Sequence, residues 1–268
     1  MSAPKKGYGQ HFLEDRGVID RILRVLAPSA VDTLLEIGPG EGALTLPLLA
    51  ASGRLTAIEL DAELIPALQR RAAALGKLAI IPADILQVDL TTLAQHLGAS
   101  KLRVVGNLPY YISSPILFHC LDHLQAIQDL HFMLQKEVVE RMAAAPGSKI
   151  YGRLSVMLQL ACRVELLFDV PARAFRPPPK VDSAVVRMLP LAPHERPAAS
   201  AQDLQLVVKA AFAQRRKTLA NALAQVLDRD AIRHAGVDPG ARAETLEPAA
   251  FVRLAQACAA RRRDAATK

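Results

Sequence analysis

Short apolar runs alternate with stretches of helical periodicity over most of the first 190 residues. The apolar runs are rich in Val, Ile and Leu and predict strands, whereas the stretches between them place apolar residues three or four positions apart and predict helices. We expect strands at 33–37, 54–60, 77–83, 102–105, 130–134, 163–168 and 181–188, and helices at 43–51, 62–75, 90–97, 113–124, 136–144 and 152–161. Strand–helix alternation is typical of βαβ units, so the pattern predicts an α/β fold with a parallel sheet covered on both faces.

The pattern changes towards the C-terminus. The segment Phe175–Lys180 (FRPPPK) contains too many prolines for a helix or an inner strand. Residues 190–200, rich in Pro and Ala, predict a linker. Helices are then expected at 204–227, 231–234 and 248–261. We therefore expect two domains, residues 1–190 with the sheet and residues 200–268 as a small C-terminal helical domain.

The composition of the chain is that of a globular protein. Of its 268 residues, 51% are apolar and 22% are charged. No apolar run approaches the roughly 18 residues of a membrane span, and residues 1–15 lack the apolar stretch of a secretory signal. The cysteines Cys120, Cys162 and Cys258 lie far apart, without metal-binding or disulfide spacing. We therefore expect a cytoplasmic protein with no membrane contact and no metal.

A glycine-rich turn, Glu36-Ile37-Gly38-Pro39-Gly40-Glu41-Gly42, follows the first predicted strand. Glycines allow the backbone to turn tightly and let a ligand approach without a Cβ in the way. Read as GxGxxA, the turn suits a dinucleotide; read as an acidic residue followed by xGxGxG, it suits S-adenosylmethionine. In either case we expect Gly38 and Gly40 to contact the cofactor.

Acidic residues end the next two predicted strands. Glu59 ends the second strand about 20 residues after Gly38, where a carboxylate can accept both ribose hydroxyls of an adenosine. Asp84 ends the third and can meet an adenine amino group, although an Asp at this place can equally be a helix N-cap. The carboxyl ends of parallel strands line one crevice. Gly38, Glu59 and Asp84 together therefore favour an adenosine-containing cofactor.

The fourth predicted strand runs into the loop Asn107-Leu108-Pro109-Tyr110. The exocyclic amine of adenine is a poor nucleophile because its lone pair is delocalised into the ring. The amide oxygen of Asn107 and the carbonyl of Leu108 or Pro109 can accept its two N–H groups and localise that lone pair for attack on a methyl group. Tyr110 can stack on the base, a contact worth roughly 1–3 kcal/mol, and Pro109 fixes the loop. The alternative is a structural turn with a core tyrosine.

Together with further matches along nearly the whole chain, these motifs resemble the small-subunit ribosomal RNA adenine N6,N6-dimethyltransferase family. The further matches are Tyr8–Leu13, 131–138, 151–156, 175–185 and 212–219. The resemblance implies a Rossmann-like, seven-stranded S-adenosylmethionine-dependent methyltransferase sheet. It also implies methyl transfer to N6 of two adjacent adenines in the 3′-terminal hairpin loop of 16S rRNA, within the immature small subunit, by a monomer.

The resemblance implies site residues as well. The cofactor contacts would be His11, Leu13, Gly38, Glu59, Asp84 and Asn107. Catalysis would use Asn107, Leu108, Pro109 and Tyr110, and the target base would lie against Tyr110 and Phe175. The chain departs from the family at His11 and Tyr111, where the family often has Asn.

The net charge of +7 is partly gathered in two clusters, Arg215-Arg216-Lys217 on a predicted helix and Arg261-Arg262-Arg263 at the end of the last one. Phosphate binding is the natural use of such clusters, although the second also suits the C-terminus of a helix. We expect Arg215, Arg216 and Lys217 to contact RNA, with specificity coming from RNA shape and a splayed loop base.

Three other functions fit parts of the pattern. An NAD-dependent oxidoreductase would share the glycine turn but not the Asn-Leu-Pro-Tyr loop. A methyltransferase acting on a large-subunit rRNA adenine and conferring antibiotic resistance would share both. A nucleic-acid-binding factor without turnover would not require Gly38, Glu59, Asp84 and Asn107 to be intact, as they are here.

Overall fold

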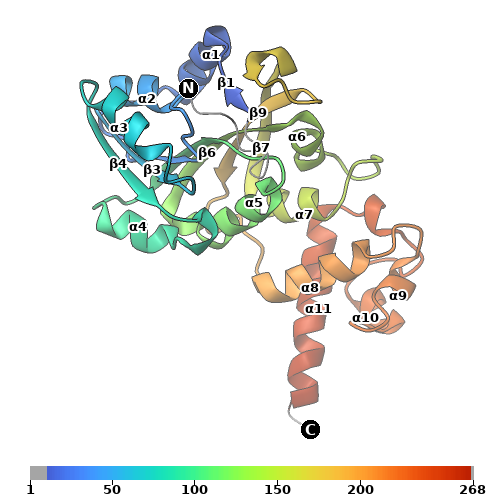
Figure 1. Cartoon of the computed structure of the whole chain (residues 1–268). Coiled ribbons are helices and arrows are strands. Elements are labelled where there is room, and N and C mark those ends of the chain that lie inside the picture. The colour runs from blue at the N-terminus through green and yellow to red at the C-terminus, as the bar shows by residue number, and fades with distance from the viewer. Residues whose placement is uncertain (1–10, 267–268) are drawn as a thin grey trace. The chain divides into compact units, whose positions relative to one another are not determined.

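The computed structural model describes residues 11–266, so Tyr8, Gly9 and Gln10 of the first family motif lie outside the described residues (Figure 1). The chain divides into two compact units. The first holds the chain up to Val139 together with Glu165–Pro190, and the second holds Glu140–Val164 and the chain from Leu191 onward. Residues 140–164, which the sequence pattern groups with the sheet, thus belong to the second unit.

A seven-stranded sheet forms the centre of the first unit, in the order β4-β3-β2-β5-β6-β9-β7. The strands are β2 (Leu34–Ile37), β3 (Arg54–Glu59), β4 (Lys77–Pro82), β5 (Leu102–Asn107), β6 (Ile127–Gln135), β7 (Cys162–Val170) and β9 (Ser183–Pro190). The pairs from β4 to β6 are parallel, and β9 is antiparallel to β6. Each predicted strand is present, and the expected Rossmann-like α/β fold is confirmed.

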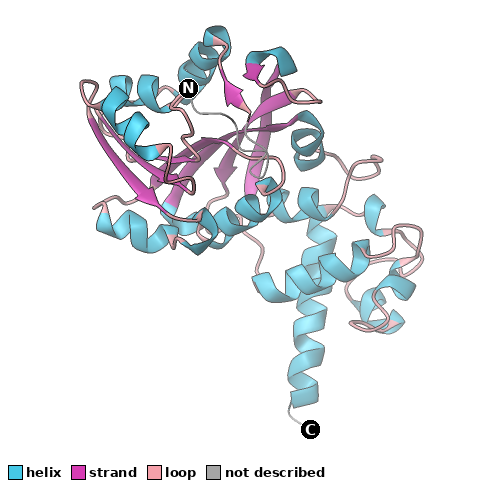
Figure 2. Cartoon of the chain, in the orientation of Figure 1, coloured by secondary structure: helices cyan, strands magenta, loops and turns pink. Residues whose placement is uncertain are grey.

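Helices cover both faces of this sheet, with α1 to α3 on one side and α4 and α5 on the other (Figure 2). The helices are α1 (Arg16–Leu26), α2 (Thr45–Ser52), α3 (Ile65–Ala72), α4 (Leu90–His96), α5 (Ser113–Asp122) and α6 (Lys136–Met142). Short 3-10 turns are η2 (Ile85–Gln87), η3 (Leu124–Ala126) and η4 (Ala172–Ala174). The buried face of α1 packs with α2 and the sheet in one apolar core.

The sequence analysis missed α1. Its buried residues Val18, Ile22 and Leu26 recur every four positions, and the Asp15 carboxylate caps the helix by accepting from Val18 N at 3.1 Å. Before α1, the strand β1 (Phe12–Leu13) pairs antiparallel with β8 (Phe175–Arg176). Only the start of the proline-rich segment is therefore a strand, and it lies outside the main sheet, in agreement with the expectation that the segment is neither a helix nor an inner strand.

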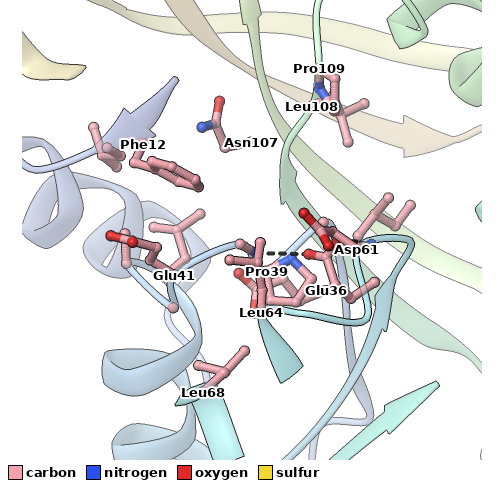
Figure 3. Close-up of a pocket in the computed structure, with 18 of the residues that line it drawn as sticks. Phe12, Glu36, Pro39, Glu41, Asp61, Leu64, Leu68, Asn107, Leu108 and Pro109 are labelled. Carbon is pink, nitrogen blue, oxygen red and sulfur yellow. Dashed lines mark hydrogen bonds between the residues drawn. The ribbon is translucent and has the colours of Figure 1, made fainter. Parts of the chain in front are cut away.

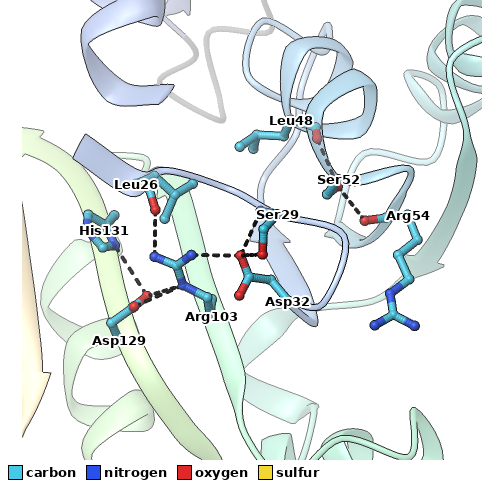
Figure 4. A network of polar contacts seen from close by, with 9 residues as sticks. All are labelled: Leu26, Ser29, Asp32, Leu48, Ser52, Arg54, Arg103, Asp129 and His131. Atoms are coloured by element: carbon cyan, nitrogen blue, oxygen red, sulfur yellow. Dashed lines mark hydrogen bonds and ion pairs between the residues drawn. The ribbon is translucent and has the colours of Figure 1, made fainter. Parts of the chain in front are cut away.

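A largely buried arginine joins β5, β6, the end of α1 and the loop before β2 at the amino-terminal end of the sheet (Figure 4). Arg103 on β5 donates to Asp32 at 2.8 Å, to Asp129 on β6 at 3.0 Å, and to the carbonyl of Leu26 at the end of α1 at 2.7 Å. Burial raises the pKa of Asp32, but hydrogen bonds from Ser29 and Arg103 outweigh it and hold this pKa below its ordinary value. The network fixes how α1 meets the sheet.

The second unit is helical. Its elements are α7 (Arg153–Gln159), α8 (Ala201–Phe212), α9 (Leu219–Ala222), α10 (Arg229–His234), η5 (Ala243–Thr245) and α11 (Pro248–Ala266). Aliphatic side chains such as Val207 and Leu254 are fully buried in this unit. Three aromatic rings pack together as well, with the ring centroid of Phe212 lying 6.1 Å from that of Tyr151 and 5.6 Å from that of Phe251. Within the described part of the chain, no helix has the length and apolar character needed to cross a membrane.

The prediction of one helix over 204–227 is wrong. The helix ends at Phe212, and a turn separates it from α9. Tertiary contacts override helix propensity here, because the Arg215 guanidinium donates to Glu244 at 3.1 Å and Leu219 N donates to Ala241 O at 2.8 Å.

Candidate active site

A cavity of about 690 Å³ opens at the carboxyl ends of β2, β3, β4 and β5 (Figure 3). This volume is in the range of sites that bind small molecules. The residues predicted to contact a cofactor or to act in catalysis all line it: His11, Leu13, Gly38, Gly40, Glu59, Asp84, Asn107, Leu108, Pro109 and Tyr110. The fold therefore brings together residues that lie as far apart in sequence as His11 and Tyr110.

The glycine turn presents bare backbone to this cavity. Gly38 and Gly40 have φ angles of 67° and 54°, in the left-handed region that favours glycine. A Cβ on Gly40 would lie 3.2 Å from the ring of Phe12. A side chain at Gly40 would therefore crowd the Phe12 ring of β1, which packs against the turn.

Glu59 holds the glycine turn from the neighbouring strand. One oxygen of its carboxylate accepts from Gly40 N at 3.0 Å, and the other accepts from Asp61 N at 2.8 Å. Burial raises the pKa of Glu59, while these hydrogen bonds lower it in part. Each oxygen accepts one such bond and has a second lone pair for a ligand hydroxyl.

Glu36 is a pocket residue that the sequence analysis used only as part of the glycine motif. It lines the cavity, is 2% exposed, and its Oε2 has no hydrogen-bond partner among the described residues. The pKa of Glu36 is raised to about 8, mainly by burial and also by the nearby Glu59, while Thr45 opposes the shift. Its place inside an otherwise apolar strand was the available signal.

Asp84 is a helix N-cap and a cavity residue at the same time. Its Oδ1 accepts from Leu86 N at 3.0 Å and so caps η2, which makes it an N-cap. The same residue lines the cavity. The cap fixes the carboxylate at the end of β4.

The loop after β5 is held from three sides. The Asn107 side chain donates from Nδ2 to the carbonyl of His11 at 3.1 Å. Leu108 is buried, and its N–H donates to Met133 O at 3.1 Å. The Tyr110 hydroxyl lies 2.7 Å from Ser183 Oγ, and the His11 ring stacks on the Tyr110 ring at 5.7 Å. The amide oxygen of Asn107 and the face of Tyr110 are thereby fixed in orientation.

Phe175 is buried beside the cavity residue Leu13. Its side chain is 4% exposed and belongs to the apolar core, with its backbone paired to Leu13. It is not among the residues that line the cavity. In this structure the ring of Phe175 faces the core and anchors β8. The expectation that Phe175 holds the target base stays a prediction.

The predicted RNA contacts lie in the second unit, on the turn after α8. The guanidinium of Arg215 is occupied, donating to Glu244 and to the carbonyls of Lys149 and Tyr151. Arg216 and Lys217 are exposed. In the second cluster, the Arg261 and Arg262 side chains pair with Asp228 at 3.4 Å and Asp203 at 2.7 Å.

Comparison with known proteins bears directly on this site. Residues 1–260 match the family described as ribosomal RNA adenine dimethylase. The chain is 56% identical over 258 residues to ribosomal RNA small subunit methyltransferase A of Xylella fastidiosa strain 9a5c, covering 96% of this chain and 97% of the relative. It is 58% identical over 256 residues to the protein of that name from Xanthomonas euvesicatoria, covering 95% and 97%.

Two solved structures share the fold. A dimethyladenosine transferase from Plasmodium falciparum has a TM-score of 0.78 at 25% identity, covering 91% of this chain and 96% of its own. The 23S rRNA methyltransferase ErmE has a TM-score of 0.69 at 27% identity, covering 92% and 99%. The resemblance drawn from the motifs is confirmed. The chain belongs to the ribosomal RNA adenine dimethylase family and is an S-adenosylmethionine-dependent methyltransferase of rRNA adenines.

Proposed function

We propose that this chain dimethylates N6 of two adjacent adenines in the 3′-terminal hairpin loop of 16S rRNA. It acts as a monomer on the immature small subunit, in the cytoplasm where ribosomes are assembled. The observation that carries the proposal is that the Asn107–Tyr110 loop, Gly38 and Glu59 line one cavity. A methyl donor and an adenine amine can therefore meet there.

The choice of the small subunit rests on the relatives. Identity is 56–58% to proteins named small subunit methyltransferase, over nearly the whole of both chains. It is 27% to a protein named as a 23S rRNA methyltransferase. The small-subunit substrate is thus favoured over the large-subunit one.

The residues of the cavity fit S-adenosylmethionine, which supplies an electrophilic methyl group on a sulfonium. Glu59 would accept from the ribose hydroxyls, and Asp84 from the adenine amine. The bare backbone at Gly38 leaves room for close approach, since a Cβ there would meet nothing within 4 Å. His11 and Leu13 would close the cavity from β1.

The catalytic step assigned to the loop needs no strong base. The Asn107 oxygen and a carbonyl of Leu108 or Pro109 would accept from the two N–H groups of the target amine, so that its lone pair points at the methyl group. These acceptors stabilise the positive charge that develops on nitrogen. Tyr110 would stack on the base. The ammonium-like product then loses its proton to water.

Each of the two domains expected from the sequence would have its own role. Residues 1–190 would carry the cofactor and the reaction, and residues 200–268 would face the RNA. Within the second of these, the exposed Arg216 and Lys217 would bind phosphates, while Arg215 holds their turn through Glu244. The experiment that tests the proposal is methyl transfer from labelled S-adenosylmethionine to isolated, unmethylated small and large subunits, with the modified bases mapped.

The expected result is dimethylation of two adjacent adenines of the small subunit alone. Methylation of large subunits instead would favour the antibiotic-resistance function. Binding of subunits without methyl transfer would indicate a nucleic-acid-binding factor that has lost turnover.

A further inference from the structure

The segment 175–183 is fastened to the cavity at both ends. At its start, the backbone of Phe175 pairs with Leu13, and the Pro177 carbonyl lies 2.7 Å from Nδ1 of His11. At its end, Ser183 Oγ bonds the Tyr110 hydroxyl at 2.7 Å. His11, Leu13 and Tyr110 all line the cavity, so the segment is anchored at both ends to residues of the cavity wall.

Two cations stand on this segment. Phe175 points into the core, so the next residue, Arg176, projects the other way, and its side chain is 66% exposed. Lys180 is also exposed, whereas Pro179 between them is buried. The prolines fix the backbone φ angles, which makes the segment a stiff support for both charges.

The neighbouring carboxylates leave the charges of Arg176 and Lys180 available to a ligand. The Glu14 carboxylate lies 3.7 Å from Arg176, but both side chains are more than half exposed, and such surface pairs contribute little. The Asp182 side chain accepts from Ala172 N at 2.9 Å and is thereby held.

Building on the proposed function, we propose that Arg176 and Lys180 bind phosphates of the rRNA strand that flanks the target adenine. The two cations would bind the RNA backbone while the target base enters between Tyr110 and the Asn107 amide. Phosphate contacts position a nucleic acid without reading its sequence, so this pair would set which nucleotide faces the cavity.

The test is the salt dependence of binding to unmethylated small subunits. Each lost phosphate contact lowers the log–log slope by about 0.7 to 0.9, so R176Q/K180Q should lower it by about 1.4 to 1.8, and each single variant by half of that. The affinity for S-adenosylmethionine, measured by calorimetry, should equal that of the wild type. This second measurement shows that the cavity is intact.

The matched control is R54Q/K77Q. Arg54 and Lys77 are exposed partners in register at the opposite, amino-terminal ends of β3 and β4, and the variant loses the same charge. Its slope should stay near the wild-type value. An unchanged slope in R176Q/K180Q, or equal losses in both double variants, would overturn the inference while the wild type still methylates small subunits. A wild type that neither binds nor methylates them would overturn the proposed function itself.

Discussion

The side-chain amide of Asn107 donates a hydrogen bond of 3.1 Å to the backbone carbonyl of His11. Because a carbonyl can only accept, this contact places the nitrogen of the amide towards β1. The amide oxygen is then turned the other way and can accept from a substrate amine. The N-terminal segment thus sets the polarity of the proposed catalytic group.

Replacing Asn107 by Ala should lower the rate of methyl transfer by about 10²–10³, since one preorganised acceptor is lost from the site. RNA binding should change little, because phosphate contacts dominate RNA affinity. Single-turnover assays at saturating cofactor measure the effect. The control is Asn221→Ala, an exposed asparagine of α9. A rate near that of the wild type for Asn107→Ala would make this loop a structural turn.

Tyr110→Phe should retain most of the activity, because the stacking face stays while only the bond to Ser183 is lost. The cost is the order of one hydrogen bond, about 1 kcal/mol of stability. Ser183→Ala removes the same bond from the other side and should behave alike. Tyr110→Ala should lose binding of the target base by about 5- to 150-fold. Equal activity of the Phe and Ala variants would remove stacking from the mechanism.

Glu59→Ala should weaken S-adenosylmethionine binding by about 10- to 150-fold, as a charged acceptor typically contributes about 1.5–3 kcal/mol. Part of this loss would come from the glycine turn, since the carboxylate also holds Gly40 N. Glu59→Gln keeps one acceptor oxygen, so its affinity for S-adenosylmethionine should lie between those of the wild type and Glu59→Ala. Calorimetry measures the dissociation constants. An unchanged constant in a folded Glu59→Ala protein would exclude this carboxylate from the site.

The buried Glu36 should make stability depend on pH. Its pKa is about 8 in the folded protein against an ordinary value of 4.5, so the folded state keeps a proton that the unfolded chain releases. The resulting stability is fully present below pH 4.5 and is lost as pH rises through 8. In Glu36→Gln the melting temperature should fall less than in the wild type between pH 5 and 8. If the melting temperatures of the wild type and Glu36→Gln changed equally with pH, Glu36 would ionise normally.

Arg103→Met should destabilise the first unit by about 3–5 kcal/mol, because two largely buried carboxylates, Asp32 and Asp129, lose their shared partner. The control is Arg187→Met, which breaks a more exposed pair with Glu165 and should cost within about 1 kcal/mol. Urea unfolding measures both. Similar urea midpoints for the two variants would mean that the Arg103 network stabilises the fold no more than the exposed Arg187–Glu165 pair does.

The central sheet and much of the cavity could be predicted because their signals are local. Glu59 and Asp84 stand directly after apolar runs, and a parallel sheet places such strand ends together. Helix α1 also had a local signal, the spacing of Val18, Ile22 and Leu26, which was overlooked beside the polar residues that alternate with them.

Other features depend on contacts between distant residues, which no local pattern encodes. Phe175 reads as an aromatic residue beside a binding motif, yet its pairing with Leu13 turns it into the core. Arg215 reads as a helical surface cation, yet Glu244 draws it into a turn. The orphaned oxygen of Glu36 likewise follows from packing alone.

The pairing of β1 with β8 has a consequence for folding during synthesis. Chains emerge N-terminus first, and their domains fold as units during synthesis. The strand that closes over the glycine turn emerges early, but its partner at Phe175 and the Ser183 that holds Tyr110 are translated about two thirds of the way along the chain. The pocket of this rRNA methyltransferase therefore cannot be completed until about two thirds of its chain has been made.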